Sequence, residues 1–530
     1  AEMPVTYDTT IELNTWDYPH LIRTYESTYM PEPIPAARLR VIDPLDKLYR
    51  GYLRAGIGLY TTPLLDFYFA QERDRYDQWG VHYKHLSSWD GIKDYANSQF
   101  MNNRIELFGR HMMNNDLYIH GSGYFNHDYL NFYGLPDSLG YDPKRLRQRY
   151  TGFGLKGGIG SYYEDSTRLN YQVNLEYNYF GDLNDNSDSL KFDYTRENHF
   201  LVDAVLRKYI EKNVLLDINT SLDFNNNVGR AAYFCEECDS IRTTNPVNNA
   251  IFRLNPGIVM QAKFFTLNAG FDFSLSLPDP ERETTVPYIY PDVEMRFNLF
   301  DNILIPYVGV DGKLERNSFR SMATENPFVL SQLELRNSSH KIRIFGGLRG
   351  AFSRRITFDA SAYYSRIDNV PLFVLDSTYS LDNRFDVVYD EIIRTRFHGQ
   401  VAYNQSEKIR IMLEGDWFIN DPVTEERAWN LPQYRFMLSG MYNLGDKIII
   451  RLDGFVVGGR YARRLFPTSG ESYSIKLNDY ADINLGVEYR YSRRLSAFLN
   501  LNNIAGARYQ RWLNYPVQGF GLLGGITYSF

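Results

Sequence analysis

The stretch FGLLGGITYSF, from Phe520 to Phe530, decides the fold of this chain. Successive side chains of a β-strand point to opposite faces, so Phe520, Leu522, Ile526, Tyr528 and Phe530 share one face. That face is apolar and aromatic, whereas the other face carries mostly glycine, threonine and serine. We predict a strand with one apolar face at the end of the given sequence.

The composition of the chain excludes several classes of protein. The 530 residues include 43 Tyr and 16% aromatic residues, and the net charge is −7. Nucleic-acid binders carry a basic face, so this balance argues against nucleic acid as a partner. No apolar run approaches the length of about eighteen residues that a transmembrane helix needs. Tyr and Trp are enriched at membrane boundaries, which favours a membrane protein that crosses with strands.

Alternating polarity continues upstream of the C-terminal strand. It is clearest in residues 214–225, 265–275 and 481–491, where every second residue except Thr220 is apolar and the intervening ones are mostly polar. Each run has about the nine to eleven residues with which a tilted strand crosses a bilayer. The fold class predicted is therefore all-β, a transmembrane antiparallel up-and-down β-barrel.

The connections between these strands alternate in length. Very short turns, such as Asn114-Asn115 and Gly445-Asp446, alternate with polar links of roughly ten to twenty-five residues, among them residues 126–150, 317–330 and 367–391. Tight turns on the periplasmic side and long outer loops are typical of outer-membrane barrels. Counting gives about 22 strands in residues 51–530, with the last strand pairing with the first near Tyr52–Tyr60. Residues 1–50 form a separate irregular arm, interpreted as periplasmic or lumenal, or as a remnant of leader cleavage.

The C-terminal block resembles the end of a TonB-dependent receptor barrel. The residues that carry the resemblance are Asn503-Ile504, Tyr509, Tyr515-Pro516, Gly521, Gly525 and Tyr528-Ser529-Phe530. The resemblance implies a 22-strand barrel in the outer membrane of a Gram-negative bacterium, with both termini periplasmic. It departs from the family in two respects. The family usually has Gly-Arg after the Pro, where this chain has Val517-Gln518-Gly519-Phe520, and the fifty residues before the barrel are too few for the family's globular plug domain.

The expected lumen of such a barrel needs something to fill it. We considered the N-terminal arm, inward-folded loops such as Asn126 to Tyr150, and another protein. The expected partners are outer-membrane lipid, other outer-membrane or surface lipoprotein subunits, and the barrel-assembly machinery during insertion.

Few residues suggest chemistry. Cys235 and Cys238 fit a small loop disulfide better than a zinc site, since no second ligand pair accompanies them. His82 and His85 are three apart on a strand and face opposite ways, so they cannot share a metal ion. Ser87 and Ser88 near His85 hint at a nucleophile, but a polar strand end explains them equally. We expect no catalytic residues, no metal site and no cofactor.

Charged side chains collect on the predicted lumenal face, and they carry both signs. They are Asp217, Asp223, Asp272, Asp416, Asp453, Asp482, Glu414, Glu488, Arg410, Arg451 and Arg490. The function expected from the sequence is a plugless receptor-like barrel that serves as a membrane-embedded subunit of a larger outer-membrane assembly for transport, export or barrel assembly. The alternative is a stand-alone passive channel for a large solute, and an enzyme is not expected.

Overall fold

The computed structural model describes eleven ranges of the chain. They are residues 49–71, 74–114, 116–141, 146–163, 168–183, 194–232, 241–243, 247–300, 303–377, 380–465 and 472–530. The predicted arm therefore lies almost wholly outside the described residues, as do Cys235 and Cys238.

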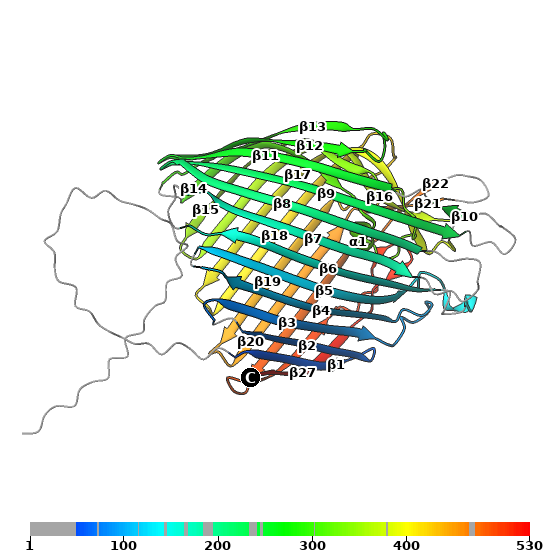
Figure 1. The fold of residues 1–530 in the computed structure, drawn as a ribbon. Coiled ribbons are helices and arrows are strands. Elements are labelled where there is room, and N and C mark those ends of the chain that lie inside the picture. Colours follow the sequence, from blue (N-terminus) through cyan, green and yellow to red (C-terminus); the bar gives the residue numbers. More distant parts are fainter. Residues whose placement is uncertain are drawn as a thin grey trace, which may run out of the picture. The chain divides into compact units, whose positions relative to one another are not determined.

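The described residues form a closed antiparallel barrel whose wall has 22 strands, as the sequence predicts (Figure 1). The first eleven wall strands are β1 Gly51–Gly58, β2 Thr62–Gln71, β3 Asp77–Ser88, β4 Phe100–Met112, β5 Leu117–Asn131, β6 Arg147–Ser161, β7 Asn170–Leu183, β8 Tyr194–Glu211, β9 Val214–Ala232, β11 Val247–Gln261 and β12 Phe265–Leu277. The other eleven are β13 Val286–Phe297, β14 Leu304–Arg316, β15 Asn337–Ser353, β16 Ile356–Asp376, β17 Arg384–Gln405, β18 Ile409–Pro422, β19 Tyr434–Leu444, β20 Ile448–Gly458, β23 Tyr480–Arg490, β24 Leu495–Asn502 and β27 Gly521–Ser529.

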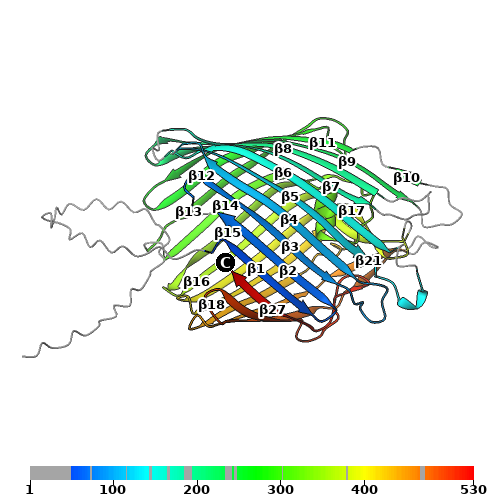
Figure 2. The same cartoon turned by 60° about the horizontal axis from the view of Figure 1, so that its bottom comes forward.

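The last strand closes the barrel on the first. β27 pairs antiparallel with β1, with Leu53 opposite Tyr528 and Gly56 opposite Gly525 (Figure 2). Two further backbone hydrogen bonds of 2.9 Å join Gly51 to Phe530. Closure leaves no unpaired edge between the first and last strands, which is how barrels avoid edge-to-edge association.

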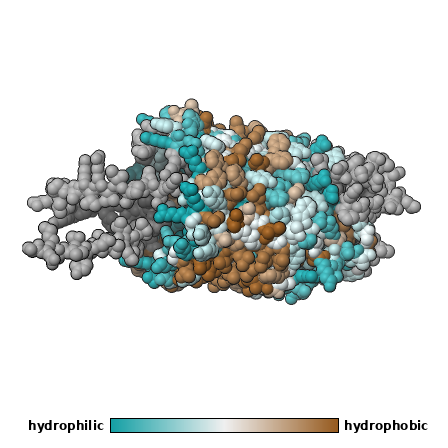
Figure 3. Space-filling model, turned by 90° about the horizontal axis from the view of Figure 1, so that it is seen from below, coloured by the Kyte–Doolittle hydropathy of each residue, from teal (hydrophilic) through white to brown (hydrophobic). Residues whose placement is uncertain are grey.

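The outside of the wall carries an apolar belt (Figure 3). Large apolar side chains in the predicted alternating runs are exposed there, among them Leu222, Phe224, Phe271, Ile483 and Tyr489. Exposed apolar area on this scale is stable only against lipid. The five apolar residues from Phe520 to Phe530 that share a face are exposed in the same way.

The two ends of the barrel differ. Turns of a few residues join the strands at one end, the short-turn end, for example between β4 and β5. Longer connections lie at the other end, the long-loop end, which is on the right in Figure 1.

The wall also varies in height. β1 has 8 residues, whereas β16 and β17 have 21 and 22. Residues 367–391, predicted as a loop, are therefore strand up to Asp376 and again from Arg384. Other parts of the chain cover both faces of this hairpin, since Phe373 and Leu375 belong to one buried apolar cluster and Leu372 and Val374 to another. Apolar residues therefore occupy both faces, and polarity stops alternating while the backbone ladder continues.

Short elements lie in the connections at the long-loop end. They are η1 Asp137–Leu139, β10 Ile241–Thr243, α1 Phe319–Glu325, β21 Tyr461–Leu465, β22 Ser472–Lys476, β25 Gln510–Trp512 and β26 Tyr515–Pro516. Within the described residues, helices are too short and too polar to span a bilayer.

Candidate functional site

The connection between β14 and β15, residues 317–336, folds into the barrel and forms what we call the cap. It contains α1, which lies inside the ring of strands toward the long-loop end (Figure 2). Ser318 begins the helix with a capping box, because its side chain accepts from Ser321 N–H and the Ser321 hydroxyl receives the Ser318 N–H. Such a box supplies partners for amides that the first helical turn leaves unpaired.

One side of the cap packs against β6, β7 and β8. Phe319 is buried, with its ring 6.0 Å from the ring of Phe180 on β7 and 6.4 Å from that of Tyr150 on β6. Its backbone N–H donates to a carboxylate oxygen of Glu197 on β8 at 2.6 Å. The Tyr150 hydroxyl donates to the carbonyl of Pro327 at 2.9 Å. Apolar packing and buried hydrogen bonds therefore hold α1 to this part of the wall.

The other side of the cap pairs with β17, which lies across the ring from β7. Leu330 N–H donates to the carbonyl of Phe385, and Phe385 N–H donates to the carbonyl of Phe328, both at 2.9 Å. The ring of Phe328 stacks on Tyr515 of β26, with 3.7 Å between ring centroids. The cap thus bridges nearly opposite sides of the barrel.

A single hydrophobic core continues through the cap and its supports. Its buried members outside the cap include Phe373, Phe385, Trp512 and Tyr515. Tyr515 is 2% exposed, its hydroxyl donates to the carbonyl of Asn383, and its burial raises the pKa of its phenol well above the usual value. A packed core with side chains in fixed contacts leaves little space for passage through this part of the lumen.

An ion cluster just before the cap joins β14 to β8 and β9. Arg316, the last residue of β14, pairs with Asp223 and lies 3.0 Å from His199. His199 in turn lies 2.6 Å from an Asp223 carboxylate oxygen. Removing one member of such a partly buried network leaves the others without their counter-charge, so the cluster holds the end of β14, after which the cap begins, to β8 and β9.

A cavity of about 640 Å³, the side pocket, lies between the cap and the part of the wall formed by β4, β5, β23, β24 and β27. Its polar lining is rich in amides and tyrosines, and among the described residues that line it none is Lys, Arg or His. Asp128 and Asp482 make it acidic. Asp482 is 7% exposed, and its Oδ1 has no partner while its Oδ2 accepts from the Tyr509 hydroxyl at 2.7 Å. The pocket can accept hydrogen bonds from a polar, hydroxyl- or amine-bearing solute.

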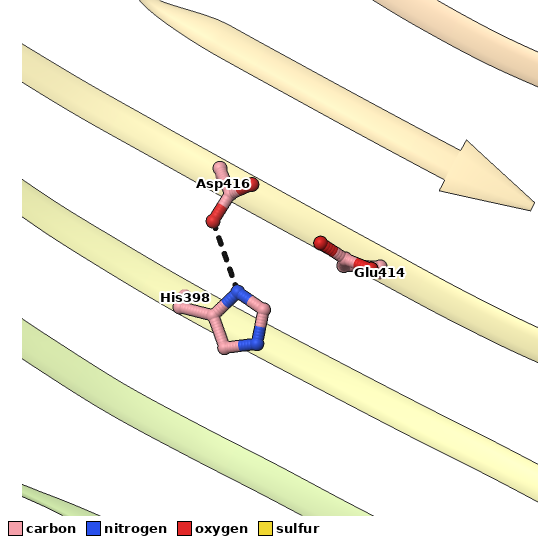
Figure 4. Close-up of side chains that lie close together, drawn as sticks. All are labelled: His398, Glu414 and Asp416. Atoms are coloured by element: carbon pink, nitrogen blue, oxygen red, sulfur yellow. Dashed lines mark hydrogen bonds and ion pairs between the residues drawn. The ribbon is translucent and has the colours of Figure 1, made fainter. Parts of the chain in front are cut away.

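One group of potential metal ligands lies on the lumenal face of β17 and β18 (Figure 4). The ligand atoms of His398, Glu414 and Asp416 are within 4.8 Å of one another. Asp416, however, already receives Arg396 at 2.8 Å, His398 at 2.9 Å and Arg435 at 2.7 Å. Two guanidinium groups neutralise this carboxylate and repel a cation, so the arrangement is a structural ion network.

Other lumenal charges predicted from the sequence also pair. Glu488 lies 3.5 Å from Arg451 and 3.6 Å from Arg490, and Glu414 lies 3.8 Å from Arg435. Mixed pairs of this kind make a polar wall and not a ring of one sign, which charge-selective filters use.

The predicted histidines face opposite sides of the wall and have separate partners. His82 lies 2.8 Å from Asp66, whereas His85 contacts Asn103 at 2.7 Å and the Ser87 hydroxyl at 3.2 Å. The serine, histidine and asparagine have the order of a nucleophilic triad. Ser87 is 0% exposed, so no substrate carbonyl can reach its hydroxyl in this conformation. The contact supports a structural role.

The cap was missed by the sequence analysis, which placed residues 317–330 in an outer loop and named residues 126–150 as an inward-folding loop. Part of that second loop does join the buried structure, since Phe132, Leu135 and Leu146 are buried. The available signal for the cap was its apolar content, because Phe319, Met322 and the leucines that follow are unusual in a solvated loop.

No known protein-family profile and no curated protein matches this sequence. Solved structures do resemble the barrel. The ferripyoverdine receptor of the outer membrane of Pseudomonas aeruginosa is 11% identical, with a TM-score of 0.67 over 91% of this chain and 72% of the receptor. The FrpB iron transporter from Neisseria meningitidis is 10% identical, with a TM-score of 0.69 over 92% and 82%.

The copper transporter OprC is 13% identical, with a TM-score of 0.65 over 91% of this chain and 81% of the transporter. At these identities the similarity concerns the fold. This chain has the barrel fold of outer-membrane receptors and transporters of Gram-negative bacteria.

Proposed function

We propose that this chain is a transport-related outer-membrane barrel that works as the membrane-embedded subunit of a larger outer-membrane assembly. The observation that carries the proposal is the cap. A barrel of this width would leak if its lumen were open, and the cap packs across the lumen from β7 to β17. A lumen that the chain closes itself is suited to a protein that acts only together with a partner.

The side of the wall formed by the long strands β16 and β17, which we call the tall side, supplies a preformed surface for such a partner. The carboxylate of Asp390 on β17 accepts from the backbone of Thr424 and Glu425 at 2.8–3.0 Å. Glu425 also accepts from Trp429 at 2.8 Å and from Arg463 of β21 at 3.0 Å. These bonds fix the loops around the β16–β17 hairpin, and a rigid surface binds a partner at a lower entropic cost.

The apolar belt and the fold support a location in the outer membrane. We place the belt in the outer membrane, the long-loop end outside and the short-turn end in the periplasm, as in outer-membrane barrels in general. In this orientation both ends of the described barrel, Tyr49 and Phe530, face the periplasm, and the tall side of the wall faces outward.

The second candidate is a stand-alone channel for a large solute, and the side pocket favours it. An acidic pocket of about 640 Å³ could hold a solute on its way through the lumen. The cap weighs against free passage, since its core would have to open for each transit.

Two experiments test the proposal. The protein is purified from its own membranes in a mild detergent, and the co-purifying proteins are identified by mass spectrometry. We expect stoichiometric partners, and a protein that is always alone and monodisperse would contradict the assembly role. Planar-bilayer recordings then separate the candidates, because a capped subunit should be silent where a stand-alone channel conducts.

A further inference from the structure

The apolar belt contains a hollow over β16, β17 and β18. This hollow, of about 530 Å³, has a floor of small residues, because Ala360, Gly399 and Gly415 are opposite one another on adjacent strands. Phe397 and Trp417 rise on one side of the floor, and Val401 and Leu413 on the other. We call it the belt groove.

The walls of the belt groove face lipid. The side chains of Phe397, Val401, Leu413 and Trp417 are 45–53% exposed on the outside of the barrel. A Cβ at Gly399 would meet no atom within 4 Å, whereas at Gly415 the ring of Phe436 lies 2.8 Å away and ends the groove. Adjacent strands are about 4.8 Å apart, so the floor extends roughly 10 Å from β16 to β18.

The groove lies in the half of the wall nearer the short-turn end, and Val401 and Leu413 are on the side of its floor that faces that end. Phe352 and Phe358 stack there, with 4.4 Å between their ring centroids. Gly415 is the seventh residue of β18 counted from that end. At about 3.3 Å per residue and a tilt near 40°, it lies roughly 15 Å into the apolar layer, which is half of a bilayer core. The groove thus has the depth of one leaflet.

Basic residues lie in the short turns next to the groove. Arg354 and Arg355 form the turn between β15 and β16, and Lys408 ends the turn between β17 and β18. Asn404 N–H donates to the carbonyl of Arg355 at 2.8 Å, which keeps the first turn beside the end of β17. All three side chains are exposed, and Glu407 is the acidic residue in these two turns.

We propose that the belt groove is a binding site for an anionic phospholipid of the leaflet that faces the short turns. One acyl chain lies on the Ala360–Gly399–Gly415 floor, and the phosphate lies against Arg355 and Lys408. Acyl chains are as apolar as the wall, so burial alone does not order a lipid here. The shape of the groove holds the chain, and the basic turns select the charge of the headgroup.

The test uses the whole protein in phosphatidylcholine vesicles that contain a small fraction of phosphatidylglycerol with a photoreactive acyl chain. After illumination, labelled peptides are mapped by mass spectrometry. We expect peptides that contain Val401, Leu413 and Trp417 to be labelled several-fold more than peptides from the opposite wall. A photoreactive phosphatidylcholine probe should label the groove less, by about fivefold for each basic side chain that contacts the phosphate.

Two variants test the two halves of the site. Gly399→Leu fills the groove and should reduce its labelling to the level of the opposite wall. Gly157→Leu is the matched control, because this glycine of β6 also lies between exposed apolar residues and a Cβ there meets nothing closer than 3.9 Å. Arg355→Gln with Lys408→Gln should abolish the preference for phosphatidylglycerol.

Several results would overturn the proposal. Equal labelling of the groove and of the opposite wall in the unaltered protein would show that the groove binds no particular lipid, and this measurement needs no variant. Labelling that is indifferent to headgroup charge would exclude the role of the basic turns. If cross-linking in native membranes joins Trp417 to a segment of another protein, the occupant of the groove is a polypeptide and not a lipid.

Discussion

Removing the Phe319 ring should open the cap. Phe319 is 1% exposed and packs against Tyr150 and Phe180, so Phe319→Ala leaves a cavity where α1 meets the wall. Buried Phe→Ala substitutions cost about 3–5 kcal/mol. In an open cap this ring is already exposed, so the substitution destabilises only the closed state. The equilibrium constant for cap opening should therefore rise by about 10²–10⁴.

The assay is single-channel recording in planar bilayers. We expect the unaltered protein to be silent and Phe319→Ala to show frequent openings. Phe271→Ala is the control, since it removes the same ring from the lipid-facing side of β12, where the side chain is 46% exposed. Hydrogen exchange of the α1 amides reports cap opening independently. If these amides lose protection while the variant stays silent, the cap is not what closes the lumen.

The remaining predictions concern the seam where β27 pairs with β1, the start of α1, the ion network around Asp416 and the loop that contains Asp479. Gly525→Ala should lower the thermal stability of the barrel, because its Cβ would lie 2.6 Å from the Gly56 Cα. Gly524→Ala is the control and should not lower it, since the atom nearest to that Cβ lies at 3.5 Å. Equal melting temperatures of the two variants would contradict this prediction. Ser318→Ala should destabilise α1 by about 0.5–2 kcal/mol through loss of the capping box, seen as faster exchange of its first amides, and Thr324→Ala at the exposed end of the helix serves as the comparison. Asp416→Asn should cost about 1–3 kcal/mol in urea unfolding, since Arg396 and Arg435 lose their carboxylate, and an unfolding midpoint like that of Asp453→Asn would argue against the network. The Gly459 N–H and the Tyr434 hydroxyl donate to the Asp479 carboxylate and hold its pKa below the usual value. These hydrogen bonds should persist above about pH 4 and weaken as the pH falls through the lowered pKa. Unchanged hydrogen exchange of the Gly459 amide in acid would refute this.

Alternating polarity was sufficient to predict the wall. Polarity alternates because one face of the sheet contacts lipid and the other contacts water, and this constraint acts on every second residue of strands such as β12 and β23. The same pattern placed the closing strand and the strand count correctly. It failed for residues 367–391, because other parts of the chain cover both faces of this hairpin and apolar residues such as Leu372 and Phe373 follow one another without alternation.

The cap was beyond the reach of such patterns. Its contacts join residues far apart in the chain, such as Phe328 and Tyr515, and its helix has only 7 residues. A helix this short has no amphipathic period to detect, and its stability comes from tertiary packing. The charges of the lumen were predicted by face, but which of them pair depends on register between strands.

The unequal height of the wall has a mechanical consequence. Beside the seam the barrel ends with the 8 residues of β1, about 25 Å of strand, whereas β16 continues for 21 residues, about 70 Å. A pull or a bound load on the tall side therefore acts through a long lever, and it acts directly on Phe385, which supports the cap. The same pull applied near the seam would meet strands embedded along almost their whole length, and would tilt the barrel in the bilayer before it moved the cap.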